Sequence, residues 1–170
     1  MKYILAAALM LLLAEPSQAN SLTNGDFSSG FVGWTTSGNT AVVSEEAVLT
    51  DDGQDFFGRV FQAAAGETAG YSFQFDLYSS LSSEVPDGTF PDLFFASLYF
   101  TNDLSSFDLD ALSFDDFLEV VDDSSSGLVS YPGVTSGGLP GGGTRFSFNF
   151  SNSYNFIIPV FEFFDDRDDK

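Results

Sequence analysis

The 170-residue chain contains no cysteine and no histidine. The lack of cysteine excludes disulfides, and the lack of both residue types excludes Ser-His-Asp and Cys-His catalysis together with thiolate or imidazole metal sites. Any metal must therefore be held by oxygen ligands, for which calcium is the natural candidate. A domain without disulfides has to be stabilised by core packing, and the 21 phenylalanines can supply that core.

Basic residues are also scarce. Five Lys and Arg stand against 25 Asp and Glu, which gives a formal net charge of −20. Such a chain repels phosphate backbones, so we expect no nucleic-acid partner, and anionic membranes are disfavoured for the same reason. The acidity is typical of a solvated surface, although some of the carboxylates could also bind calcium.

The first residues have the pattern of a cleavable export signal. Lys2 precedes an apolar run over residues 3–14, and Ser17-Gln18-Ala19 is a small-x-small cleavage site. The run is too short to span a bilayer, so we expect no membrane insertion. The sequence predicts a signal peptide over residues 1–19 and a secreted or cell-surface protein. Residues 20–170, a length typical of one domain, would form the mature chain.

Two segments alternate cleanly between apolar and polar residues, which is the pattern of half-buried strands. In residues 71–78 the odd positions are apolar, and in residues 145–151 the even positions are apolar. Residues 41–43 and 47–49 resemble a hairpin, and residues 58–62 a short strand. Residues 93–100 are apolar on both faces, as expected for a central strand. Residues 156–164 are similar, but Pro159 predicts a bulge or an edge position there.

Residues 103–126 have two interpretations. Phe107, Ala111, Phe114, Leu118 and Val121 fall at helical spacing, which is compatible with one or two helical turns, but the end of the segment also fits a strand. Many short strands with frequent turns and almost no helical signal predict an all-β fold, an antiparallel β-sandwich of the jelly-roll kind.

The stretch NGDFSSGFVGWTTSG at residues 24–38 resembles the first strand of galactose-binding-like jelly rolls, the fold of many carbohydrate-binding modules. VVSEEAVLTDDG resembles the second and third strands of that family, and VFQAAAGETAGYSFQFDL resembles its Q-x-x-x-A-G-x-T segment. The later stretches FASLYF, TRFSFNF and FIIPVFEFFD resemble an exported bacterial subgroup that often carries a C-terminal Pro-Glu-Pro sorting tail. In that family Phe27 would plug the core, Gly30 and Gly33 would let the chain bend back, and Trp34 would pack over the sandwich end.

The sequence departs from that family at two places. Many members have Glu after the Phe of N-G-x-F-E as a ligand of a structural calcium, whereas Ser28 stands here. Members also continue beyond the acidic turn into a last strand that is lacking here, so the domain could be a fragment. The resemblance makes Asp26, with Asp165 and Asp166, the candidate calcium ligands, and a solvated charge run is the alternative.

Sugars are bound by aromatic stacking together with planar polar groups that hydrogen-bond to hydroxyls. If strands 71–78 and 145–151 are neighbours, their polar faces would converge, whereas the alternative is an ordinary wet sheet face. Trp34 could act as a stacking platform or simply pack in the core. The candidate ligand-binding residues are Trp34, Gln74, Asp76, Tyr78, Arg145 and Asn149.

We therefore expect an exported, non-catalytic module that resembles carbohydrate-binding domains and binds extracellular or cell-surface glycans, with structural calcium as a candidate cofactor. The alternative is a structural protein of an exopolysaccharide matrix or surface layer without a defined small ligand. A small hydrolase with two catalytic carboxylates is a third class, but no motif selects a carboxylate pair.

Overall fold

The computed structural model describes residues 22–50, 57–66, 70–79, 81, 92–124, 127–151 and 153–164. These ranges contain strands and turns but no helix, so none of their segments is a helix able to cross a membrane. The expected signal peptide, residues 1–19, lies outside them. The all-β prediction is confirmed.

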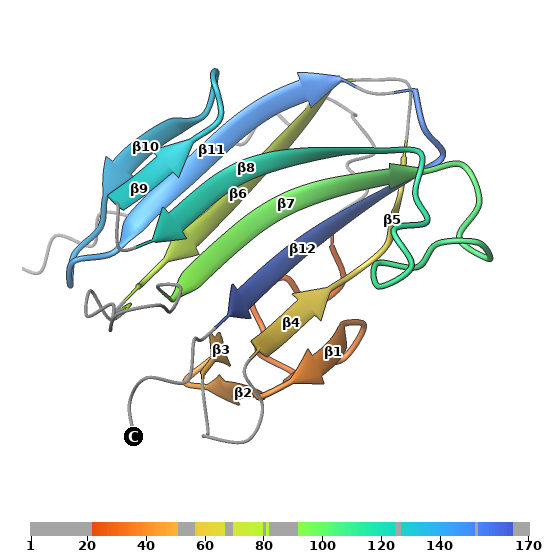
Figure 1. Ribbon diagram of the computed structural model, residues 1–170. Coiled ribbons are helices and arrows are strands. Elements are labelled where there is room, and N and C mark those ends of the chain that lie inside the picture. The colour runs from red at the N-terminus through yellow and green to blue at the C-terminus, as the bar shows by residue number, and fades with distance from the viewer. Residues whose placement is uncertain are drawn as a thin grey trace, which may run out of the picture.

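The described residues form twelve strands, which make two packed sheets and a separate hairpin, and all of their pairings are antiparallel (Figure 1). The larger sheet has the order β1-β4-β12-β7-β8-β9, with β5 also paired to β12, and the smaller has the order β10-β11-β6. β2 and β3 form the hairpin. The strands are β1 (Thr35–Gly38), β2 (Thr40–Val43), β3 (Glu46–Leu49), β4 (Phe57–Phe61), β5 (Ala64–Ala65), β6 (Gly70–Leu77), β7 (Leu93–Thr101), β8 (Asp116–Ser124), β9 (Gly127–Ser130), β10 (Thr135–Gly138), β11 (Thr144–Ser151) and β12 (Phe156–Phe164).

The core lies between the two sheets, as in a β-sandwich. The even residues of β7, such as Phe94 and Leu98, point into it, and Phe146 and Phe148 of β11 meet them from the smaller sheet. The odd residues of β6 pack against the same cluster, whereas its even residues are exposed. The alternation expected for residues 71–78 and 145–151 is therefore confirmed.

The sequence pattern also predicted the hairpin, the short strand at 57–61 and the central position of β7. The expectation of a bulge or an edge position at Pro159 is wrong. β12 lies in the interior of the sheet between β4 and β7, and its register against β7 runs through the Pro159–Leu98 pair without a bulge. The Pro159 carbonyl accepts a hydrogen bond from the Gln62 N–H at 3.4 Å, so the nitrogen of Pro159 faces the same side. Gln62 lies in the gap between β4 and β5, which places the missing donor opposite an interruption of the neighbouring strand.

Residues 103–124, the described part of the ambiguous segment, contain no helix. Residues 102–115 form a turn-rich loop, closed by the Asp108–Ser113 bridge, and β8 follows it. A bulge opposite Ala96 and Ser97 lets the adjacent Val120 and Val121 both enter the core. The strand alternative for the end of this segment is thus confirmed.

The two sheets differ in width, and this difference creates a seam beside β6. The smaller sheet ends at β6, while β12 and β4 of the larger sheet continue past it. The β2–β3 hairpin packs on the inner face of β4, where a Cβ added to Gly58 would come within 3.3 Å of Leu49. Figure 1 shows this hairpin and β1 at one end of the sandwich. We call β1 together with the β2–β3 hairpin, residues 35–49, the N-terminal cover. The candidate site lies in the seam between β6 and this cover.

Candidate functional site

The N-terminal loop, residues 22–33, is a series of turns held by one asparagine. The Asn24 side chain donates a hydrogen bond to the Gly30 carbonyl at 2.6 Å and accepts one from the Ser29 N–H at 2.9 Å. Gly30 and Gly33 have φ values of 66° and 85°, in the left-handed region that glycine adopts most easily. The expected bend at these glycines is therefore present.

A buried glutamine fixes this loop to the larger sheet. The Gln62 side chain accepts a hydrogen bond from the Thr23 N–H at 2.6 Å and donates to the carbonyls of Thr23 and Gly33 at 3.0 and 2.6 Å. Because a buried amide that loses its partners is costly, these three bonds hold the loop in one position. The position of the loop in turn determines the position of Trp34.

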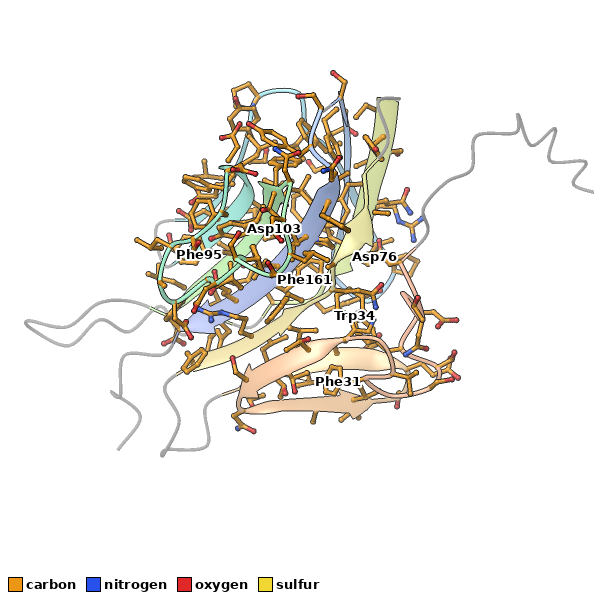
Figure 2. All side chains as sticks on the ribbon, turned by 90° about the vertical axis from the view of Figure 1, so that its right-hand side faces the viewer. Phe31, Trp34, Asp76, Phe95, Asp103 and Phe161 are labelled. Carbon is orange, nitrogen blue, oxygen red and sulfur yellow. The ribbon has the colours of Figure 1, made fainter. Side chains whose placement is uncertain are left out.

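Trp34 packs in the seam between the N-terminal cover and the sandwich (Figure 2). It is 9% exposed, and its ring lies 5.0 Å from the Phe27 ring and 6.4 Å from the Phe161 ring, between centroids. The indole N–H donates to the Asn24 carbonyl at 3.1 Å. The packing interpretation of Trp34 describes this geometry. Phe27 was expected to plug the core, but it is half-buried and packs against Trp34 outside the core clusters of the sandwich.

Beside Trp34 a cleft of about 900 Å³ runs along β6, and we call it the β6 cleft. Its floor is apolar and aromatic, with Trp34, Phe73, Phe161 and other core side chains reaching it from both sheets. Its rim carries five carboxylates and no Lys or Arg among the described lining residues. The rim carboxylates are Asp26, Glu45, Glu46, Asp76 and Asp92.

The outward face of the β6–β11 pair is a polar ladder next to the cleft. The Arg145 guanidinium donates two hydrogen bonds to the Asp76 carboxylate, from Nε to Oδ1 and from Nη2 to Oδ2, both at 2.7 Å. This paired contact lowers the pKa of Asp76 below its ordinary value. One step along, the Ser147 hydroxyl donates to Gln74 Oε1 at 3.3 Å, and Asn149 lies opposite Ser72.

Tyr78 ends this ladder against a glycine-rich turn. A Cβ added to Gly143 would come within 2.5 Å of Tyr78 Cε1, so only glycine lets the ring lie this close to the backbone. The turn is closed by a hydrogen bond from the Leu139 N–H to the Gly143 carbonyl at 2.7 Å. Tyr78 is 53% exposed and is one of the residues that line the cleft. Tyr78 is therefore the exposed aromatic side chain best placed for stacking there.

The structure divides the six predicted ligand-binding residues into two adjoining groups. Trp34, Gln74, Asp76 and Tyr78 line the β6 cleft. Arg145 and Asn149 lie on the neighbouring outward face of β11, where Arg145 is tied to Asp76. The prediction that the two polar strand faces converge is confirmed, because β6 and β11 are paired in register.

Of the three predicted calcium ligands, only Asp26 lies within the described residues. Its Oδ1 accepts hydrogen bonds from the Ser28 N–H at 3.2 Å and the Ser28 hydroxyl at 2.9 Å, and these bonds lower the pKa of Asp26. Asp165 and Asp166 lie outside the described ranges. Within those ranges no group of three or more acidic side chains is arranged to hold a metal. Asp26 thus fits the chemistry of one calcium ligand, as an ionised carboxylate.

The reasoning from sequence missed Glu45 and Glu46, which stand at the turn of the β2–β3 hairpin on the cleft rim. The sequence signal was the polar SEE tripeptide between two apolar segments. Ser44 and Glu45 both have positive φ, as in a two-residue hairpin turn. That pattern predicts the turn, but it does not show that the turn and β6 line the same cleft.

Comparison of the chain with family models, curated proteins and solved structures finds no match.

Proposed function

We propose that this protein is an exported, non-catalytic glycan-binding module, and that the β6 cleft together with the β6–β11 ladder is its binding site. The observation that carries the proposal is an aromatic-floored cleft of about 900 Å³ with planar polar side chains at its wall. The volume lies within the usual range for small-ligand sites.

The chemistry of the wall suits sugar hydroxyls. The Asp76–Arg145 pair presents a planar donor and acceptor set, and the amide of Gln74 adds a further donor and acceptor beside it. Tyr78 supplies an exposed ring against which the apolar face of a pyranose can pack. A stacked ring beside planar hydrogen-bonding groups is the arrangement expected for sugar recognition.

The resemblance to galactose-binding-like jelly rolls and the export signal support the same proposal. They also extend it to a structural calcium bound by Asp26 together with Asp165 and Asp166. The described residues supply one of these carboxylates, whose role would be to fix the N-terminal loop beside the cleft.

Binding is tested by titration calorimetry of the purified mature chain against neutral oligosaccharides that differ in sugar and linkage. We expect Tyr78→Ala to weaken binding about fivefold, since aromatic contacts contribute roughly 1 kcal/mol. Tyr131→Ala is the matched control, because Tyr131 is also about half exposed (46%) but does not line the cleft. Absence of binding to every glycan by a folded sample would refute the proposal, and release of reducing sugar would refute its non-catalytic part.

A second candidate function is structural, as a component of an extracellular matrix, and β9 favours it. Among the described strands β9 pairs only with β8, so it forms one edge of the larger sheet. Its edge exposes Leu128, Val129 and the nearby Tyr131 at 44, 61 and 46%. Exposed apolar edges can add further chains. Concentration-dependent assembly in sedimentation experiments, abolished by Val129→Lys, would favour this function over glycan binding.

A further inference from the structure

The charges around the β6 cleft narrow the class of glycan that it can bind. The described residues contain two basic side chains, Arg59 and Arg145, and both are already paired with carboxylates. Arg59 contacts Glu162 and Asp110, and Arg145 contacts Asp76, each at 2.7 Å. A uronate carboxylate or a sulfate entering the cleft would therefore find no unpaired cation in this part of the chain.

The rim of the cleft has the opposite character. Asp26, Glu45 and Glu46 have no cationic partner among the described residues, and all three are exposed. Glu45 and Glu46 are adjacent at the hairpin turn, and both line the cleft together with residues of β6. The whole chain, at −20, adds a long-range field of the same sign.

The exposed ring of Tyr78 adds a second contribution of the same kind. The negative potential of an aromatic face attracts a cation placed above it, and Tyr78 offers such a face at the cleft. A ligand that carries both a pyranose face and an ammonium group would use the ring twice, once for apolar packing and once electrostatically. The carboxylates of the rim would then neutralise the ammonium groups.

We propose that the β6 cleft selects glycans that carry free amino groups, such as de-N-acetylated hexosamine chains, over neutral glycans and strongly over acidic ones. This inference rests on the proposed glycan-binding function and specifies its ligand class. The selectivity comes from Glu45 and Glu46 at the rim, and the shared affinity for all sugars comes from Tyr78 and the Asp76–Arg145 wall.

The test is calorimetric titration at pH 5.5, where Asp and Glu side chains are ionised. Four ligands of equal length are compared: a hexamer of glucosamine, a hexamer of N-acetylglucosamine, a hexamer of galacturonate and a hexalysine peptide. In about 20 mM salt we expect the glucosamine hexamer to bind at least tenfold more tightly than the acetylated one. In about 0.5 M salt the advantage should fall below threefold, because screening then acts within a few ångströms. The galacturonate hexamer should not bind.

Variants locate the source of the selectivity. Glu45→Gln and Glu46→Gln should each weaken glucosamine binding about threefold, as expected for exposed charge pairs, and leave N-acetylglucosamine binding unchanged. Glu119→Gln is the control, since it removes the same charge from an exposed site of β8 that does not line the cleft. Circular dichroism of each variant checks that it is folded.

The outcomes separate the inference from the function beneath it. Equal affinity for the amino and acetylated hexamers would overturn the amine selectivity while leaving glycan binding intact. Failure of every sugar to bind would overturn both. Hexalysine binding as tight as that of the glucosamine hexamer would overturn the inference in favour of a general cation-binding surface. Equal weakening of both sugar hexamers by the Glu45 and Glu46 variants would overturn the assignment of selectivity to these carboxylates.

Discussion

The ion pair between Arg59 and Glu162 allows a quantitative test of how this sandwich is stabilised. The two side chains stand opposite each other on β4 and β12, and Arg59 Nε donates to Glu162 Oε1 at 2.7 Å. Their side chains are only 13% and 11% exposed. Arg59 also contacts Asp110 at 2.7 Å, but that carboxylate is 82% exposed. One guanidinium thus forms a buried and an exposed pair that can be compared within one protein.

Removing one member of a buried pair leaves the other without a partner, which costs about 3 kcal/mol or more. We therefore expect Arg59→Met to lower the free energy of unfolding by about 3 kcal/mol. Glu162→Met should cost about 2 kcal/mol, less because Asp110 still contacts the guanidinium. The double variant replaces the pair by apolar side chains and should cost less than either single change. Asp110→Asn removes only the exposed contact and should cost less than 1 kcal/mol.

Urea unfolding of the four variants at neutral pH measures these differences, with the slope of each transition checked for a common unfolding reaction. The double-mutant cycle should give a coupling energy of about 3 kcal/mol or more between Arg59 and Glu162. The reasoning would be refuted if Arg59→Met cost no more than Asp110→Asn. It would also be refuted if the effects of the two methionine substitutions on the free energy of unfolding were additive, because the buried pair would then have no coupling energy.

Three further predictions follow from local geometry. Gly38→Ala should lower the free energy of unfolding by about 3 kcal/mol or more, because Gly38 has a φ of 69° and an added Cβ would overlap the Phe57 carbonyl. Gly30→Ala should lower it by about 1 kcal/mol, because Gly30 has a similar φ of 66° but an added Cβ would lie in open space. Equal urea midpoints for the two variants would contradict this prediction. The hydrogen bonds from Arg145 lower the pKa of Asp76 in the folded protein, so their stabilisation is present above the unfolded pKa and is lost as the pH falls through the folded one. Arg145→Met should therefore be less stable than the parent at pH 7 but equal to it well below pH 3.8, and a deficit independent of pH in urea unfolding would exclude this cause. Calcium should raise the melting temperature relative to a chelator, and Asp26→Asn should abolish the shift. Asp103→Asn, which removes the carboxylate charge from a matching exposed Asp–Ser turn, should leave the shift intact, and a shift unchanged by Asp26→Asn would exclude Asp26 as a ligand.

The helical spacing within residues 103–126 shows how a periodic pattern can mislead. Phe107 and Phe114 pack against Tyr99 on the outer face of the larger sheet, whereas Leu118 and Val121 belong to the core between the sheets. Ala111, between them, is exposed. Side chains that a helix would place on one stripe are thus buried on two faces of the same sheet. A loop that folds over a sheet has no period of its own, and the bulge in β8 then shifts the strand period by one residue.

The local sequence pattern was sufficient to assign side chains to the core or to solvent wherever a strand has one buried face and one solvent-exposed face. The alternation in residues 71–78 and 145–151 assigned Phe73, Phe75, Phe146 and Phe148 to the core, and Gln74, Asp76, Arg145 and Asn149 to the outward face, because successive side chains in a strand point to opposite sides. The turn residues Gly30 and Gly33 were similarly recognisable, since the need for positive φ is a property of the residue type.

The β6 cleft depended on contacts between segments distant in sequence. It exists because the smaller sheet ends at β6 while β12 and β4 extend beyond it, and because Gln62 anchors residues 22–33 over that extension. Strand order also placed Pro159 in an interior strand opposite the gap between β4 and β5. The order in which strands pair and the relative width of the two sheets depend on contacts between segments that are distant in the sequence. No local pattern of residues records them, and they decide where the aromatic floor and the acidic rim meet.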